Sequence, residues 1–144
     1  MLKRVTLVLV AVIFAISMIS PALAADMTPE QLVKEAKASI AEVSIDNVKK
    51  MIESKENIML LDVTDKQEFE QGHLPGAINI SRGTLEFKAA TIIPDKNAKI
   101  IVYCGTDRRS PLATKTLNDL GYKSAVNMTG GLKAWKEAGY PVVK

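Results

Sequence analysis

The 144-residue sequence contains one cysteine, one histidine and one tryptophan. With Cys104 alone no disulfide can form within the chain, and with His73 alone no histidine-rich metal site can form. We expect no metal and no cofactor. Cys104 itself has two interpretations: an unpaired cysteine in an exported chain indicates a reactive thiol, whereas a buried cysteine often serves only as a small apolar side chain.

The chain also has little excess charge. It carries 19 basic and 16 acidic residues, and two of the basic ones, Lys3 and Arg4, lie at the amino terminus, which leaves 17 basic residues in the rest. No block of like charges runs through the sequence. Nothing therefore indicates nucleic acid or a membrane surface as a partner.

The amino terminus resembles an export signal. Lys3 and Arg4 precede an almost wholly apolar run, residues 5–19, and Ala22-Leu23-Ala24 follows it. A basic region, an apolar core and a small-x-small site are typical of a secretory signal peptide, here residues 1–24. The apolar run is shorter than the roughly 20 residues that span a bilayer, which disfavours an uncleaved anchor. Cleavage after Ala24 would release a single domain, without a membrane segment, into the periplasm or the medium.

Helices and strands are predicted to alternate after the signal peptide. A capping box formed by Thr28 and Gln31 opens a helix, and residues 25–41 are expected to form a helical extension that is packed on the domain or partly free. The domain covers residues 42–144. Its predicted strands are residues 58–61, 77–80, 99–103 and 124–128, and its predicted helices are residues 45–54, 66–71, 109–120 and a last helix after Gly130-Gly131. This alternation predicts an α/β fold, a mostly parallel sheet with helices on both faces.

Cys104 stands between the end of one predicted strand and the start of a predicted helix. In open parallel sheets, ligands bind beyond the carboxyl ends of the strands. The start of a helix has unpaired N–H groups and a positive dipole end, and both favour a bound anion. This field, with Arg108 and Arg109 close by, also favours the thiolate, which is the nucleophilic form of cysteine.

Three segments resemble the signatures of the rhodanese family. The first signature is similar to Leu60-Leu61-Asp62-Val63, followed by Glu68-Phe69 and by Gly72-His73-Leu74-Pro75-Gly76-Ala77-Ile78-Asn79-Ile80. The active site of the family is similar to the loop at Cys104. The closing signature is similar to Gly130-Gly131-Leu132, Ala134-Trp135 and Ala138-Gly139-Tyr140-Pro141-Val142. The resemblance covers about residues 42 to 144, in the order and spacing of the family.

This resemblance implies a three-layer rhodanese-like fold and a thiosulfate sulfurtransferase activity. A donor such as thiosulfate would leave a sulfane sulfur on Cys104 as a persulfide. An acceptor, either cyanide or a thiol on a small molecule or a protein, would then take the sulfur. The residues expected to bind the substrate are Gly105, Thr106, Asp107, Arg108, Arg109 and Ser110. We expect the protein to act as a monomer.

The length of the loop separates sulfur transfer from its nearest rival. Cysteine phosphatases and the related arsenate reductases have an arginine six residues after the cysteine, in a wider loop that encloses a tetrahedral anion. Here Ser110 holds that position, and Arg109 lies five residues after Cys104. The shorter sequence separation between the cysteine and the arginine favours a sulfurtransferase. It also makes Arg109 a better candidate than Arg108 for contacting the substrate.

Three positions depart from the family pattern. Gly105 replaces a basic residue, Asp107 replaces a glycine, and Thr64 replaces the arginine after Asp-Val. A carboxylate beside an anion site opposes both thiolate formation and thiosulfate binding, unless Asp107 turns outward or pairs with Arg108 or Arg109. If the carboxylate faces the anion site, the substitution Asp107→Gly is expected to raise thiosulfate turnover.

Three further residues are expected to support the site. Asp62 ends a strand and is expected to anchor loops by hydrogen bonds rather than to act in catalysis. His73 lies in a turn sequence, which favours a structural role over a catalytic pair with Cys104. Trp135 is expected in the core or the pocket wall, and Gly130 and Gly131 are expected to allow a close backbone approach.

Three classes of function remain open for this sequence. The protein could be a sulfurtransferase, or a persulfide carrier with little turnover of its own. It could also be an interaction module with a rhodanese fold and no catalytic role. The presence of Cys104 argues against the third class, and kinetics are needed to separate the first two.

Overall fold

Five parallel strands form the central sheet of the computed structural model, which describes residues 26–144. In spatial order the strands are β1 (Glu42–Val43), β5 (Ala125–Met128), β4 (Ile100–Tyr103), β2 (Met59–Asp62) and β3 (Ile78–Asn79). Each neighbouring pair is parallel, which confirms the predicted α/β fold. The predicted signal peptide, residues 1–24, lies outside the described residues.

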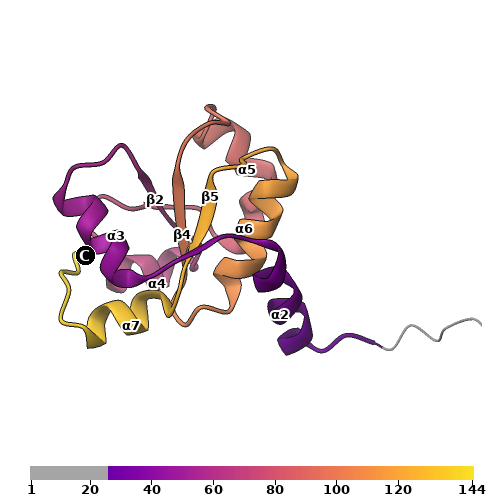
Figure 1. Ribbon diagram of the computed structural model, residues 1–144, viewed down its shortest axis with the longest axis horizontal. Helices are drawn as coiled ribbons and strands as arrows, with labels where there is room; N and C mark the ends of the chain where they lie inside the picture. The colour runs from indigo at the N-terminus through magenta and orange to yellow at the C-terminus, as the bar shows by residue number, and fades with distance from the viewer. Residues whose placement is uncertain (1–25) are drawn as a thin grey trace, which may run out of the picture.

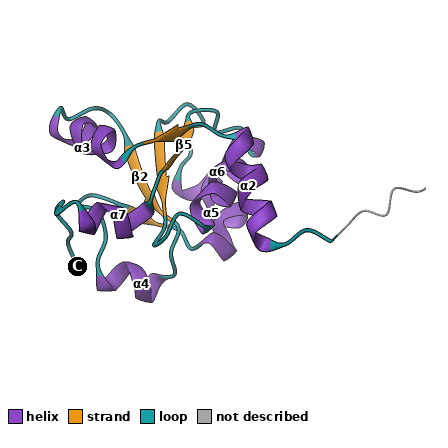
Figure 2. Cartoon of the chain, turned by 60° about the horizontal axis from the view of Figure 1, so that its bottom comes forward, coloured by secondary structure: helices purple, strands orange, loops and turns teal. Residues whose placement is uncertain are grey.

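Helices cover both faces of this sheet (Figures 1 and 2). They are α2 (Pro29–Ser39), α3 (Ile45–Glu53), α4 (Lys66–Gln71), α5 (Leu85–Ile92), α6 (Arg109–Asp119) and α7 (Gly131–Glu137), with a short 3-10 helix at Arg82–Thr84. One half of the core lies between the sheet and helices α5 and α6. The other half lies between the sheet and helices α3 and α7. The fold is therefore three layers with two hydrophobic cores.

Strand β4 occupies the centre of the sheet, and its four residues are fully buried. Ile100 and Val102 pack into one half of the core, and Ile101 and Tyr103 pack into the other. A strand buried on both faces is apolar at every position, which explains the continuous run in the sequence. Its carboxyl end delivers Cys104 to the edge of the sheet where Asp62, at the end of β2, also lies.

Helix α2 begins as the sequence predicts. The N–H of Gln31 donates to Oγ1 of Thr28, and the N–H of Thr28 donates to Oε1 of Gln31, so the capping box is confirmed. The helix runs beside α6 (Figures 1 and 2), and Ala36 is buried in the contact between the extension and the domain. Of the two arrangements expected for this extension, the structure shows the packed one.

Three elements were not predicted from the sequence: helix α5, strand β1 and the short 3-10 helix at Arg82–Thr84. Helix α5 has no side-chain cap at its start, and Phe87 within it is 85% exposed, so its apolar residues do not follow a clear helical stripe. Strand β1 is only two residues long and is defined by its pairing with β5. Among residues 26–144, no helix is both long enough and apolar enough to cross a membrane.

Candidate active site

Cys104 is the first residue after β4 and lies at the base of the loop that leads to α6. Its side chain is buried, with 1% of the residue exposed, and it forms no disulfide. We call residues 104–109 the cradle loop. The predicted strand–loop–helix arrangement around Cys104 is confirmed.

The start of α7 holds the cradle loop from outside. The N–H of Leu132 donates to the carbonyl of Cys104 at 2.8 Å, and the N–H of Lys133 donates to the carbonyl of Gly105 at 2.9 Å. These bonds direct two of the loop's carbonyl groups toward α7. Within the described residues, none of the N–H groups of residues 105–109 donates to a backbone carbonyl. The loop therefore has free donors of the kind that bind an anion.

Gly131 makes this close approach possible. Its φ is +60°, and a Cβ at this position would lie 2.5 Å from the carbonyl oxygen of Cys104. No side chain fits at that distance, because the atom it meets belongs to the backbone. Gly130 has a φ of +81°, and its Cβ would lie 2.6 Å from Cβ of Ala134. The expected close backbone approach is confirmed for Gly131, whereas the close neighbour of Gly130 is a side chain of the following helix.

The Asp107 carboxylate binds groups outside the loop. One oxygen accepts a hydrogen bond from Nδ2 of Asn127 at 2.8 Å, and the other accepts from Nζ of Lys37 at 2.6 Å and from the N–H of Gly130 at 3.0 Å. Of the two arrangements that the sequence left open for Asp107, the structure shows the outward one rather than a pair with Arg108 or Arg109. The partner is Lys37, from helix α2, and both carboxylate oxygens are engaged away from the loop's N–H groups.

The two arginines of the cradle loop pair with acidic residues on other helices. Arg108 lies at the exposed surface and contacts Glu30 at 2.7 Å. Arg109 is half-buried and donates from Nη1 and Nη2 to the two carboxylate oxygens of Glu68, each at 2.7 Å. A Cβ built on Gly105 would lie 3.8 Å from Nη2 of Arg109, so the guanidinium lies beside the loop.

The Arg109–Glu68 pair changes the titration of both groups. The hydrogen bonds from Arg109 hold the pKa of Glu68 below its usual value of 4.5. The hydrogen bonds of Glu68 raise the pKa of Arg109, and Cys104 contributes a smaller electrostatic effect. Glu68 also accepts a bond from the N–H of Asp65 and so caps helix α4. Glu68 belongs to the segment that resembles the first family signature, but nothing in the sequence indicated that it would contact the loop at Cys104.

Two predicted substrate-binding residues lie at opposite extremes of burial. Thr106 is exposed at the outer part of the loop. Ser110 is fully buried in the first turn of α6, and within residues 26–144 its Oγ has no hydrogen-bond partner. A buried hydroxyl without a partner is unusual in folded proteins. Ser110 is therefore a candidate donor to a sulfur anion, and its role in substrate binding stays a prediction.

Asp62 is buried and anchors the loop after β2. Its Oδ1 accepts from the N–H of Thr64 at 2.8 Å and from its hydroxyl at 2.5 Å, whereas Oδ2 has no partner among the described residues. Thr64 thus satisfies only one oxygen at the position where the family pattern has an arginine. On the neighbouring strand, burial of the Tyr103 side chain raises the pKa of its hydroxyl, and the charge of Asp62 adds a smaller effect in the same direction. The same hydroxyl accepts a hydrogen bond from the N–H of Leu74.

His73 and Trp135 have structural contacts. The ring of His73 stacks on Phe69 with centroids 3.6 Å apart, and its Nδ1 lies 2.8 Å from the Phe69 carbonyl oxygen. Trp135 is fully buried, and its Nε1 donates to the carbonyl of Pro141 at 2.9 Å. These contacts favour a structural role for His73 and a core position for Trp135.

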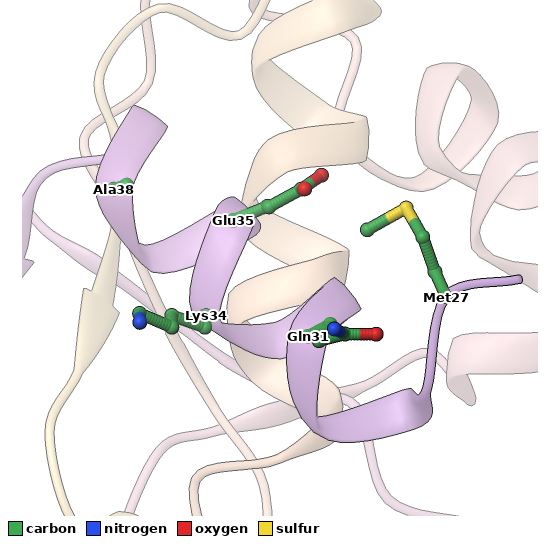
Figure 3. A pocket seen from close by; sticks show the side chains of 5 residues that line it. All are labelled: Met27, Gln31, Lys34, Glu35 and Ala38. Atoms are coloured by element: carbon green, nitrogen blue, oxygen red, sulfur yellow. The ribbon is translucent and has the colours of Figure 1, made fainter. Parts of the chain in front are cut away.

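The hollows of the surface lie apart from Cys104. One is on the flank of α2, where Met27 and Glu35 point to the same side of the helix and Lys34 points away from them (Figure 3). Another lies between α4 and α5 and is lined by residues such as Phe69, Ser81 and Lys88. Neither includes a residue of the cradle loop, so the loop itself and its N–H groups are the candidate anion site.

Comparison with known proteins places this geometry in a family. The model of the rhodanese-like domain matches residues 44–138. The chain is 40% identical over 73 residues to the thiosulfate sulfurtransferase PspE of Escherichia coli, covering 51% of this chain and 69% of PspE. It is 33% identical over 101 residues to YrkF of Bacillus subtilis, described as a candidate sulfur carrier protein, covering 70% of this chain. The match spans 54% of YrkF, about half its length.

Two solved structures have a similar fold. A Rhodopseudomonas palustris protein of unknown function, described as a possible tyrosine phosphatase, gives a TM-score of 0.77 at 28% identity, covering 86% of this chain and 100% of its own. A polysulfide-sulfur transferase homodimer from Wolinella succinogenes gives a TM-score of 0.66 at 34% identity, covering 77% of this chain and 83% of its own. The matches of this chain thus include sulfurtransferases and a candidate sulfur carrier. The chain belongs to the rhodanese-like domain family.

Proposed function

We propose that this protein is a sulfurtransferase that carries a sulfane sulfur on Cys104. The observation that carries the proposal is the cradle loop: a single buried thiol precedes residues 105–109, whose N–H groups donate to no backbone carbonyl, and α7 binds two of the loop's carbonyl groups. A persulfide on Cys104 would be anionic, and such donors stabilise an anion. The PspE and Wolinella matches support the same chemistry.

With thiosulfate as donor, the reaction has two steps. The Cys104 thiolate attacks the sulfane sulfur, a new S–S bond forms, the S–S bond of thiosulfate breaks, and sulfite leaves with the electron pair. A nucleophilic acceptor, cyanide or a thiolate, then attacks the outer sulfur of the persulfide. The Cys104 thiolate is released, and the product is thiocyanate or a new persulfide.

Intact mass spectrometry tests this proposal. Wild-type protein incubated with thiosulfate should gain one sulfur atom, and cyanide should remove it with release of thiocyanate. Cys104→Ser should gain none. If no sulfane donor, including polysulfide and an organic persulfide, adds sulfur to Cys104, the proposal fails and a binding module becomes the better interpretation.

A persulfide carrier with little turnover is the second candidate. It is favoured by the neutralisation of every charged side chain in the cradle loop, because Asp107, Arg108 and Arg109 each have a partner on another helix. No unpaired cation then attracts a dianionic donor. Steady-state rates with thiosulfate and cyanide distinguish the two: a stable adduct with negligible turnover identifies a carrier.

Phosphatase activity is the remaining alternative, and the description of the Rhodopseudomonas protein makes it worth testing. The five-residue step from Cys104 to Arg109 argues against it, because a tetrahedral phosphate needs the wider loop. Saturable hydrolysis of an aryl phosphate by wild-type protein, absent in Cys104→Ser, would overturn the sulfurtransferase proposal.

We also propose that the protein acts in the periplasm or outside the cell, because residues 1–24 have the pattern of a cleaved signal peptide. Expression of the full chain followed by fractionation and amino-terminal sequencing tests this. The expected result is a chain in the periplasm or the medium that begins at Ala25, and an intact amino terminus in the membrane fraction would contradict it.

A further inference from the structure

We propose that helix α2 is a working part of the active site, in which Lys37 holds the cradle loop through Asp107. Lys37 would be a positioning residue for the chemistry of Cys104. Helix α2 (Pro29–Ser39) lies outside the segment that matches the family, residues 44–138. The role in sulfur transfer rests on the proposed function, whereas the effect on Cys104 can be measured without it.

The contact between Lys37 and Asp107 joins parts of the chain that are 70 residues apart. Lys37 donates to Asp107 at 2.6 Å and also lies 3.1 Å from a carboxylate oxygen of Glu42, the first residue of β1. Asn127 donates to both Glu42 and Asp107. The Asp107 side chain is 13% exposed, so this network is largely shielded from water.

Asp107 has a left-handed backbone conformation, with φ of +60°. For a residue other than glycine this conformation costs about 1 kcal/mol. The three hydrogen bonds of its carboxylate come from α2, from β5 and from the start of α7, and they oppose that strain. The same bonds hold the turn that leads from the cradle loop into the first turn of α6.

A second contact between α2 and the loop, Glu30 with Arg108, is much weaker. Both side chains are more than 60% exposed, and pairs of that kind contribute about 0–1 kcal/mol. A shielded hydrogen bond to a charged group contributes more, about 1.5–3 kcal/mol. The inference therefore rests on Lys37 and not on Arg108.

Lys37 also compensates the negative charge of Asp107 beside the anion site. Partial burial lowers the pKa of Lys37, but the hydrogen bonds and charges of Asp107 and Glu42 outweigh it and leave the pKa raised, so Lys37 is charged at neutral pH. Without this cation, the negative charges of the Asp107 and Glu42 carboxylates would lie near the loop with no lysine to balance them. Nearby negative charge disfavours an anion, whether it is a thiolate, a persulfide or thiosulfate.

The test compares Lys37→Met with Lys37→Arg and with the control Lys34→Met, which lies on the same helix. Alkylation of Cys104 by iodoacetamide is measured across pH, and kcat and KM for thiosulfate are measured in parallel. For Lys37→Met we expect the pH of half-maximal alkylation to rise by about one unit and kcat/KM to fall about tenfold. Lys37→Arg should restore both to within about twofold of wild type.

A double-mutant cycle shows whether the effect passes through Asp107. In the Asp107→Asn background, Lys37→Met should move the alkylation profile much less than in wild type, because Glu42 is then the only carboxylate of the pair left without its cation. A Lys37→Met variant with a lower melting temperature but wild-type alkylation and kcat would overturn the inference. A shifted profile with no sulfur transfer by any variant would refute the sulfurtransferase proposal and leave the inference supported.

Discussion

Arg109 donates from both terminal nitrogens to the two carboxylate oxygens of Glu68, each at 2.7 Å. The arginine expected to contact the substrate is therefore paired with an acidic residue of α4. An anionic donor must share this guanidinium or displace Glu68 from it. Glu68 is then a candidate for setting how strongly the site attracts highly charged donors.

Glu68→Gln should lower the KM for thiosulfate about three- to fivefold. Both partners are partly exposed, so the lost attraction corresponds to at most about 1 kcal/mol. Glutamine still has a side-chain oxygen to accept from Asp65, so the start of α4 should be preserved. The control is Glu70→Gln, on the same helix. An unchanged KM in Glu68→Gln would show that Arg109 does not bind the donor.

The same pair makes a small part of the stability depend on pH. Hydrogen bonds from Arg109 lower the pKa of Glu68 in the folded protein, so its stabilisation is fully present above the usual value of 4.5 and is lost as pH falls through the lower folded pKa. The difference in melting temperature between wild type and Glu68→Gln should be constant above about pH 5 and shrink as the pH falls below the usual pKa of 4.5. Thermal unfolding across pH measures it, and a difference that does not shrink in acid would contradict the assignment.

Local signals in the sequence were sufficient for most of the fold. The capping box at Thr28, the apolar strand before Cys104 and the close backbone approach at Gly131 were each predicted from the local sequence, and each was confirmed. Helix α5 was missed because its start has no side-chain cap and Phe87 interrupts its apolar stripe.

The partners of the loop's charged residues could not be predicted in this way. Lys37 and Asp107 are 70 residues apart, and Glu68 and Arg109 are 41 apart. No periodicity or motif specifies which of many surface charges will meet after folding. The sequence therefore predicted that Asp107 needs a partner, whereas only the packing of α2 against α6 identifies Lys37 as that partner.

Gly131→Ala should destabilise the protein by about 3 kcal/mol and impair Cys104. The left-handed backbone accounts for about 1 kcal/mol, and the remainder comes from a Cβ placed 2.5 Å from the Cys104 carbonyl oxygen. Gly139→Ala is the matched control, because its φ is +74° and no atom lies within 4 Å of its Cβ. Equal losses of unfolding free energy in the two variants would show that the contact with the cradle loop has no effect.

Asp107→Gly should lower thiosulfate turnover, the reverse of what a carboxylate facing the anion site would give. Glycine relieves about 1 kcal/mol of left-handed strain. It also removes charge-assisted bonds to Lys37 and to the Gly130 N–H, which contribute about 2–3 kcal/mol together with the unpaired donors left behind. The net expected loss is therefore about 1–2 kcal/mol in unfolding free energy, which chemical denaturation measures. The rate of thiocyanate formation from thiosulfate and cyanide should fall as well.

Asp107→Ala keeps the strain as well as losing the bonds, so it should be about 1 kcal/mol less stable than Asp107→Gly. Faster turnover at unchanged stability in Asp107→Gly would mean that the carboxylate opposes the donor after all.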